Sequence, residues 1–184
     1  MAKSEEQIIS ELNVLRETYG GGHKVHGAKT VYLQSPWWKN KQQEHLISSY
    51  EALLKNPTVA YVYAPILNQF EGNVYSEDGD FEPDYMWAKQ VYLADVTAMN
   101  GSEIGVLLET PSEPDAGSEY EAGYMTAQGK PVIAHYYKGE INDKENPVNL
   151  MISFGVASYV TSPEELEKFD FRQIKTRVFE GKII

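Results

Sequence analysis

Short apolar runs alternate with amphipathic stretches along most of the chain. An apolar run bounded by polar or turn residues predicts a buried strand, and apolar residues three and four positions apart predict one face of a helix. The predicted strands lie at 29–34, 58–64, 104–108, 132–136 and 155–160, and the helices between them at about 39–55, 83–98 and 118–129. A last short helix follows Ser162. This order predicts an α/β fold with a doubly wound, flavodoxin-like parallel sheet of about five strands, in three α/β/α layers.

The first 28 residues stand apart from this alternation. They contain apolar residues at helical spacing among charged ones, namely Ile8, Ile9, Leu12 and Leu15. Three glycines, Gly20–Gly22, then interrupt the predicted helix. The chain is therefore expected to consist of an N-terminal helical extension with a glycine-rich linker, 1–28, and a domain covering 29–184. The extension is expected to pack on this domain or on a neighbouring subunit.

The expected sheet has a ligand edge, because doubly wound sheets bind ligands beyond the C-terminal ends of their strands. Aromatic and polar residues that follow the first three strands belong to this edge; they are Trp37, Trp38, Gln69 and Asp115. The loop 65–82 is longer than a plain connector, and loops of this length in compact domains are usually functional or mobile. The helix after it is expected to bury Met86, Val91 and Leu93.

The segment 114–132 concentrates carboxylates where a helix is expected to begin. Ser118 with Glu121 three residues later matches a capping box, which predicts a helix start at Ser118. Gly129 followed by Pro131 predicts its end. A carboxylate in the first turn lies beside unpaired backbone N–H groups, so Glu121 is expected to stay ionised, which suits a nucleophile. The alternative is that Glu121 only caps its helix.

Composition narrows the possible functions. The 184 residues, 42% of them hydrophobic, fit one globular domain with a full core. The net charge of −11 argues against DNA or RNA as a partner, because polyanion binding needs a basic face. With no cysteine and no metal-ligand spacing among the four histidines, no metal site is expected. No apolar run approaches the roughly 20 residues that span a membrane, and no signal peptide is apparent, so we expect a cytoplasmic protein without a membrane partner.

Carboxylates, aromatic rings and amides remain as the chemistry of the ligand edge. No glycine-rich nucleotide-binding motif and no Gly-x-Ser-x-Gly elbow accompany them, so no cofactor is expected. The set suits glycosyl transfer, in which one carboxylate attacks the anomeric carbon and another handles the proton of the leaving group. Stacked rings and amides would hold a flat heterocycle.

Over about residues 29–182, the chain resembles the nucleoside 2-deoxyribosyltransferases. Any one matching segment is weak, but their joint order and spacing are specific. In chain order the segments are Val31-Tyr-Leu-x-Ser-Pro-Trp-Trp38, Asn68-Gln-Phe-x-Gly72, Asp95 in Tyr-Leu-Ala-Asp-Val, Asp115-x-Gly-x-x-x-Glu121-x-Gly-Tyr-Met125, Gly129-Lys-Pro-Val132 and Asn149-Leu-Met151.

The resemblance implies a catalytic role for four residues. A glutamate at the Glu121 position attacks C1′ of a 2′-deoxynucleoside, and a deoxyribosyl–enzyme ester forms with overall retention. The resemblance places Tyr32 on this nucleophile, Asp95 in proton transfer to and from the base, and Asp115 near the reacting centre. Asp95 also lies near the predicted end of its helix, where an acid is electrostatically unfavourable, and this favours a functional role.

The resemblance also implies substrate contacts and an assembly. Gln69 would contact the base, and Trp37 and Trp38 would form an aromatic wall. Asn149 and Met151 would reach the active site of a neighbouring subunit, in a homo-oligomer based on dimers, with a hexamer as one form. The substrates would be 2′-deoxynucleosides and free bases, with no cofactor. The extension 1–28 has no counterpart in short family members.

Several readings stay open at this stage. The Asn68-Gln69 pair favours exchange of both purines and pyrimidines, whereas Gly117-Ser118 favours a purine-specific enzyme; of the two, exchange of both base types is the expectation. An N-glycoside hydrolase of 2′-deoxynucleosides or their 5′-monophosphates would use a similar glutamate, but a phosphate would need arginine or a glycine-rich cradle after the first strand. A non-catalytic nucleoside-binding module would not need Asp95, Asp115 and Glu121 together.

Overall fold

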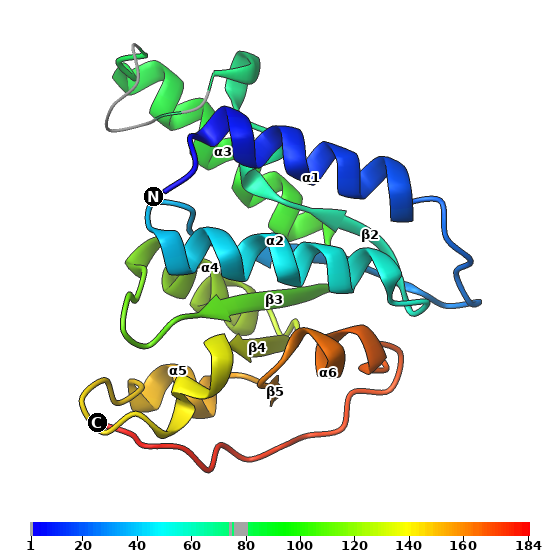
Figure 1. Cartoon of the computed structure of the whole chain (residues 1–184), viewed down its shortest axis with the longest axis vertical. Helices are drawn as coiled ribbons and strands as arrows, with labels where there is room; N and C mark the ends of the chain where they lie inside the picture. Colours follow the sequence, from blue (N-terminus) through cyan, green and yellow to red (C-terminus); the bar gives the residue numbers. More distant parts are fainter. Residues whose placement is uncertain (1, 74, 76–80) are drawn as a thin grey trace.

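A central parallel sheet with helices on both faces forms the protein, as a computed structural model shows (Figure 1). The structure describes residues 2–73, 75 and 81–184. The strands are β1 (Lys29–Gln34), β2 (Val59–Tyr63), β3 (Ile104–Glu109), β4 (Val132–Tyr136) and β5 (Ser158–Val160). They pair in parallel in the order β2-β1-β3-β4-β5, which is the flavodoxin-like order. The predicted fold is confirmed.

Two helix layers cover the sheet, each with its own apolar core. One face packs against α2 (Asn40–Lys55) and α6 (Pro163–Lys168). The other face packs against α3 (Tyr85–Gly101), α4 (Ala116–Ala127) and α5 (Leu150–Gly155). Short 3-10 turns, η1 (Pro65–Leu67), η2 (Phe70–Gly72) and η3 (Tyr137–Asn142), lie in the loops after β2 and β4. Part of the long loop predicted at 65–82 lies outside the described residues.

The N-terminal extension forms helix α1 (Glu5–Tyr19), which lies alongside α2 on the outer side of the sheet (Figure 1). Ile8 and Leu12 are fully buried and join the same apolar cluster as α2. The periodicity of this segment therefore predicted both the helix and its buried face. Among the described residues, no helix has the length and apolar character to cross a membrane.

The predicted start of α4 was wrong. The helix begins at Ala116, and Asp115 is its N-cap, whose Oδ2 accepts hydrogen bonds from the Ser118 backbone N–H and hydroxyl, both at 2.8 Å. Asp and Ser are comparably good N-caps, and Asp115 comes three residues earlier in the chain. Ser118 is consequently inside the first turn, and Glu121 lies in the second. The predicted end is close, since Gly129 follows the helix with a left-handed φ of 74°.

The burial predicted for α3 and the start predicted for the last strand were also wrong. Met86 and Leu93 are 64% and 43% exposed, Val91 is only partly buried, and Met99 is the buried residue of the helix. Part of the apolar surface of α3, including Met86 and Leu93, is therefore exposed in the described part of this chain. The last strand begins at Ser158 rather than Gly155, because Gly155 is still the last residue of helix α5, and Val156 and Ala157 connect the two elements.

Candidate active site

A cleft of about 610 Å³ opens at the C-terminal edge of the sheet. Its lining includes Ser35 and Pro36, which follow β1, and Asp115 and Gly117, which follow β3. The strand order reverses between β1 and β3, and ligands of doubly wound sheets bind at such a reversal. One side of the cleft is helix α3, which contributes Asp95 among others. The cleft therefore lies where the fold class predicts a ligand.

Glu121 lines this cleft and is in direct contact with Tyr32 of β1. Tyr32 is fully buried in β1, and its hydroxyl donates a hydrogen bond to Glu121 Oε1 at 2.7 Å. The ring of Tyr63 from β2 stacks on that of Tyr32, with centroids 5.4 Å apart and planes at 12°. Two strands of the sheet thus hold the phenol that orients the Glu121 carboxylate.

The protonation of Glu121 departs from the expectation drawn from its helix. Burial raises its pKa to about 8; the hydrogen bond from Tyr32 lowers this pKa in part, while the charges of Asp95 and Asp115 raise it further. Since α4 begins at Ala116, Glu121 has no unpaired N–H group beside it, and the first-turn argument for a permanently ionised carboxylate fails. Without a bound substrate, the Glu121 carboxyl is therefore largely protonated near neutral pH.

Asp95 occupies a second carboxylate position in the cleft. Burial raises its pKa to about 6, against the lowering effect of the nearby Tyr32 and Tyr63 hydroxyls. The helix continues to Gly101, so Asp95 is farther from the helix end than predicted, and the argument from the helix dipole does not apply. Burial in a cleft, not position in the helix, is what makes this acid unusual. An acid with such a pKa can exchange protons near neutral pH.

Aromatic rings form one wall of the cleft. Trp37 is 8% exposed and belongs to the apolar core, whereas Trp38 is 41% exposed, and their rings lie 4.8 Å apart at 39°. The chain has three tryptophans, and all of them, including Trp87 of α3, line the cleft. Gln69 also lines it and donates an amide hydrogen bond to the Pro65 carbonyl at 2.9 Å. Flat apolar walls with a few amides suit a heterocyclic ligand.

Asn149 and Met151 do not line this cleft. The Asn149 side chain caps α5 by accepting a hydrogen bond from the Met151 N–H at 2.8 Å, and Met151 is 73% exposed. The C-terminal residue Ile184 pairs with the backbone of Val148 and Leu150 on either side of Asn149. The role of Asn149 and Met151 in the site of a neighbouring subunit stays a prediction.

Several aromatic residues of the site were not identified from the sequence, and Tyr63 and Trp87 are two of them. Tyr63 ends β2, and its only signal was a tyrosine at the ligand edge of a strand. Trp87 lies in α3, whose near absence of charge could have indicated a helix that lines a cleft. Within the described part of the chain, no three histidine, cysteine or acidic side chains gather in a way that could hold a metal.

The chain is similar to proteins of one known family. The family model described as nucleoside 2-deoxyribosyltransferase matches residues 31–151. The nucleoside deoxyribosyltransferase of Lactobacillus leichmannii is 31% identical over 159 residues, which cover 84% of this chain and 98% of that protein. The one from Lactobacillus johnsonii is 30% identical over 149 residues, with 80% and 97% coverage.

Solved structures show the same fold. The 2-deoxyribosyltransferase of Bacillus psychrosaccharolyticus superposes with a TM-score of 0.63 and 23% identity, over 81% of this chain and 99% of that one. A conserved protein of Enterococcus faecalis V583 gives a TM-score of 0.56 at 20% identity, over 76% and 95%. The family match and the curated relatives show that the chain belongs to the nucleoside 2-deoxyribosyltransferase family of transferases.

Proposed function

We propose that this protein transfers 2-deoxyribose between nucleobases by double displacement through an ester on Glu121. The main supporting observation is the hydrogen bond from Tyr32 to Glu121, a residue that lines the cleft together with Asp95 and Asp115. A lone capping glutamate would need neither a buried phenol nor two further acids. The family of the chain and the names of its relatives support the same reaction class.

In the first step, the ionised Glu121 carboxylate attacks C1′ as the bond from C1′ to the base nitrogen breaks. Asp95, in its protonated form, gives its proton to the leaving base. In the second step, a ring nitrogen of an incoming base attacks C1′, the ester bond breaks, and Asp95 takes the proton from that nitrogen. Each displacement inverts C1′, so the two together retain the configuration. Asp115 would bind the sugar near the reacting carbon.

The cleft lining favours nucleosides over nucleotides. Among the described residues that line it, none is lysine or arginine, whereas a 5′-phosphate would need a cation or a glycine-rich cradle. Trp37, Trp38 and Gln69 would hold the base by stacking and hydrogen bonding. Stacking contacts recognise any flat heterocyclic ring and depend little on the hydrogen-bonding groups along its edge. We therefore propose that both purines and pyrimidines are accepted.

Incubation of thymidine with adenine, without added metal or cofactor, tests this function. The expected products are 2′-deoxyadenosine and thymine, and Glu121→Ala should abolish their formation. Free deoxyribose as the main product despite abundant adenine would instead establish a hydrolase. Binding without any turnover would establish a nucleoside-binding module. Adenosine should react far more slowly than 2′-deoxyadenosine, because a 2′-hydroxyl would crowd the nucleophile; equal rates would refute this selectivity.

We also propose that the active form is a homo-oligomer with shared sites. Helix α3 has 17 residues, of which only Lys89 and Asp95 are charged and only Met99 is buried among the described ones. Further exposed apolar residues lie on the same side of the sheet, on α4 and α5; they are Tyr120, Leu150, Met151 and Phe154. An apolar helix face of this kind is usually covered in the working protein. A second copy would also bring Asn149 and Met151 to a site that lacks them.

A further inference from the structure

The N-terminal extension is connected to the aromatic wall of the cleft through one side chain. Gln43 of α2 is buried, and its Oε1 accepts a hydrogen bond from the Lys3 backbone N–H at 2.8 Å. Its Nε2 donates to the Lys3 carbonyl at 2.9 Å and to the Trp37 carbonyl at 3.0 Å. The amide thus links the start of the extension to the residue that begins the aromatic wall.

Apolar packing reinforces this link. Ile8 and Leu12 of α1 are fully buried in the cluster that also contains Trp37 and Ile66. Ile66 belongs to η1, which α1 contacts and which lies just before Gln69 in the chain. The extension therefore supports both segments that carry the expected base contacts. The matched family segment covers residues 31–151, so α1 lies outside it, whereas Gln43, Trp37 and Ile66 lie within it.

We propose that α1 braces the base-binding wall, with Gln43 as a positioning residue that acts through Trp37. This inference rests on the proposed function, in which Trp37 and Trp38 hold the base. The reacting groups lie elsewhere: Asp95 and Glu121 belong to α3 and α4, on the opposite face of the sheet from α1. Loss of the brace should therefore weaken base binding and leave the chemical step nearly unchanged.

A pair of substitutions at Lys3 isolates the brace. Lys3→Pro removes the backbone N–H that Gln43 accepts, whereas Lys3→Ala keeps it; both lose the same exposed side chain. Relative to Lys3→Ala, we expect Lys3→Pro to raise KM for adenine about fivefold, as for loss of one net hydrogen bond, with kcat within about twofold. Gln43→Ala also loses the bond to Trp37 and should raise KM further, by about tenfold or more.

Tryptophan emission gives a second readout, because the three tryptophans of the chain all line the cleft. Lys3→Pro and Gln43→Ala should shift the emission maximum and weaken the quenching by adenine, while Lys3→Ala behaves as the wild type. Equal KM and emission for Lys3→Pro and Lys3→Ala would overturn the brace. So would a lower thermal midpoint with an unchanged KM, since α1 would then only stabilise the fold.

The two readouts also separate this inference from the proposed function. If the wild type transfers no deoxyribose, the proposed function fails, but the emission and adenine titration of the two Lys3 variants still test the brace. If the wild type is active and the variants bind adenine equally well, the brace alone fails. An effect of Gln43→Ala without one of Lys3→Pro would assign the support to α2 and exclude α1.

Discussion

Tyr32 is the residue through which the sheet acts on the candidate nucleophile. Replacing it with phenylalanine keeps the stack on Tyr63 but removes the hydrogen bond to Glu121. A hydrogen bond to a charged group contributes about 1.5–3 kcal/mol, so kcat/KM at pH 7 should fall about 10-fold to 100-fold. Tyr124→Phe is a matched control, because its hydroxyl bonds Asn100 away from the cleft. Activity near the wild-type value for Tyr32→Phe would contradict this role.

The two perturbed carboxyls predict the pH dependence of the reaction. The active form needs Glu121 ionised and Asp95 protonated, yet burial raises the pKa of Glu121 to about 8 and that of Asp95 to about 6. Below pH 6 the rate should rise with pH as Glu121 ionises, and above pH 8 it should fall as Asp95 loses its proton. Between these limits the reactive form is roughly one molecule in a hundred, and kcat/KM should be nearly flat.

Asp95→Asn tests whether the rise in rate with pH belongs to Glu121 and the fall above pH 8 to Asp95. An amide needs no proton, so the fall above pH 8 should disappear, and the rate should rise to a plateau at a lower level. The midpoint of the rise should lie at or below about pH 8, because the charge of Asp95 contributes to the raised pKa of Glu121. An alkaline fall that persists in this variant would assign it to another group.

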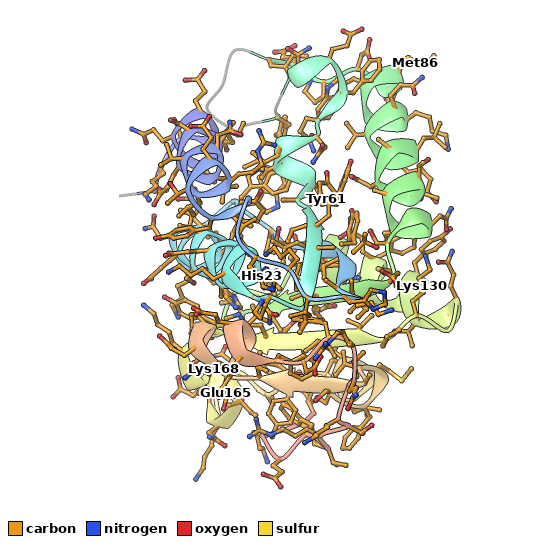
Figure 2. The ribbon with its side chains drawn as sticks, turned by 90° about the vertical axis from the view of Figure 1, so that its right-hand side faces the viewer. His23, Tyr61, Met86, Lys130, Glu165 and Lys168 are labelled. Carbon is orange, nitrogen blue, oxygen red and sulfur yellow. The ribbon has the colours of Figure 1, made fainter. Side chains whose placement is uncertain are left out.

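Among the elements, α3 depends on a contact from outside the helix. Lys130, in the Gly-Lys-Pro segment after α4, donates through Nζ to three carbonyls at the C-terminal end of α3, those of Met99, Asn100 and Ser102, at 2.6–2.8 Å. Figure 2 shows Lys130 near this end of the helix and Met86 at the other. The cation satisfies unpaired carbonyls and complements the helix dipole. The Gly-Lys-Pro segment that ends α4 therefore also holds α3, the helix that carries Asp95.

Lys130→Met should consequently destabilise the fold by about 1–3 kcal/mol, which urea unfolding followed by circular dichroism would measure. Lys144→Met is the control, because Lys144 is exposed in a loop and should change stability very little. Equal unfolding midpoints for the two variants would show that water replaces the Lys130 contacts at no cost.

The elements also show what sequence patterns can predict. The strands were predictable because most of them are short apolar runs that the fold buries. The order of the motifs indicated that Asp95 and Glu121 share one cleft, with Tyr32 against Glu121. The start of α4 was not predictable, because Asp115 and Ser118 are both good caps and only the three-dimensional fold selects one. Proton affinities were not predictable either, since they depend on how far the folded chain excludes water from each carboxyl.

At the scale of the whole molecule, the exposed side of α3, α4 and α5 explains the wrong burial prediction for α3. Periodicity identifies apolar positions that are buried in the working protein, but it does not distinguish burial within the chain from burial against another subunit. We predict that Phe154→Asp lowers the molecular mass measured by sedimentation and reduces transfer at least tenfold, because a buried charge opposes association. Val14→Asp is the matched control: both side chains are 57% exposed, but Val14 lies on α1, across the sheet. An unchanged mass for Phe154→Asp would exclude this face as the interface.

Subunit mixing tests whether the sites are shared. Glu121→Ala and Asn149→Ala should each be inactive alone, since one lacks the nucleophile and the other lacks the residue expected to complete a neighbour's site. In a mixed dimer, one site would combine Glu121 from one subunit with Asn149 from the other, and so be intact. Random exchange of equal amounts should restore about a quarter of the wild-type activity, because half of the dimers are mixed and each has one good site. If Asn149 served only its own chain, as the cap of α5, exchange would restore nothing, since each mixed dimer would keep one defect at each site.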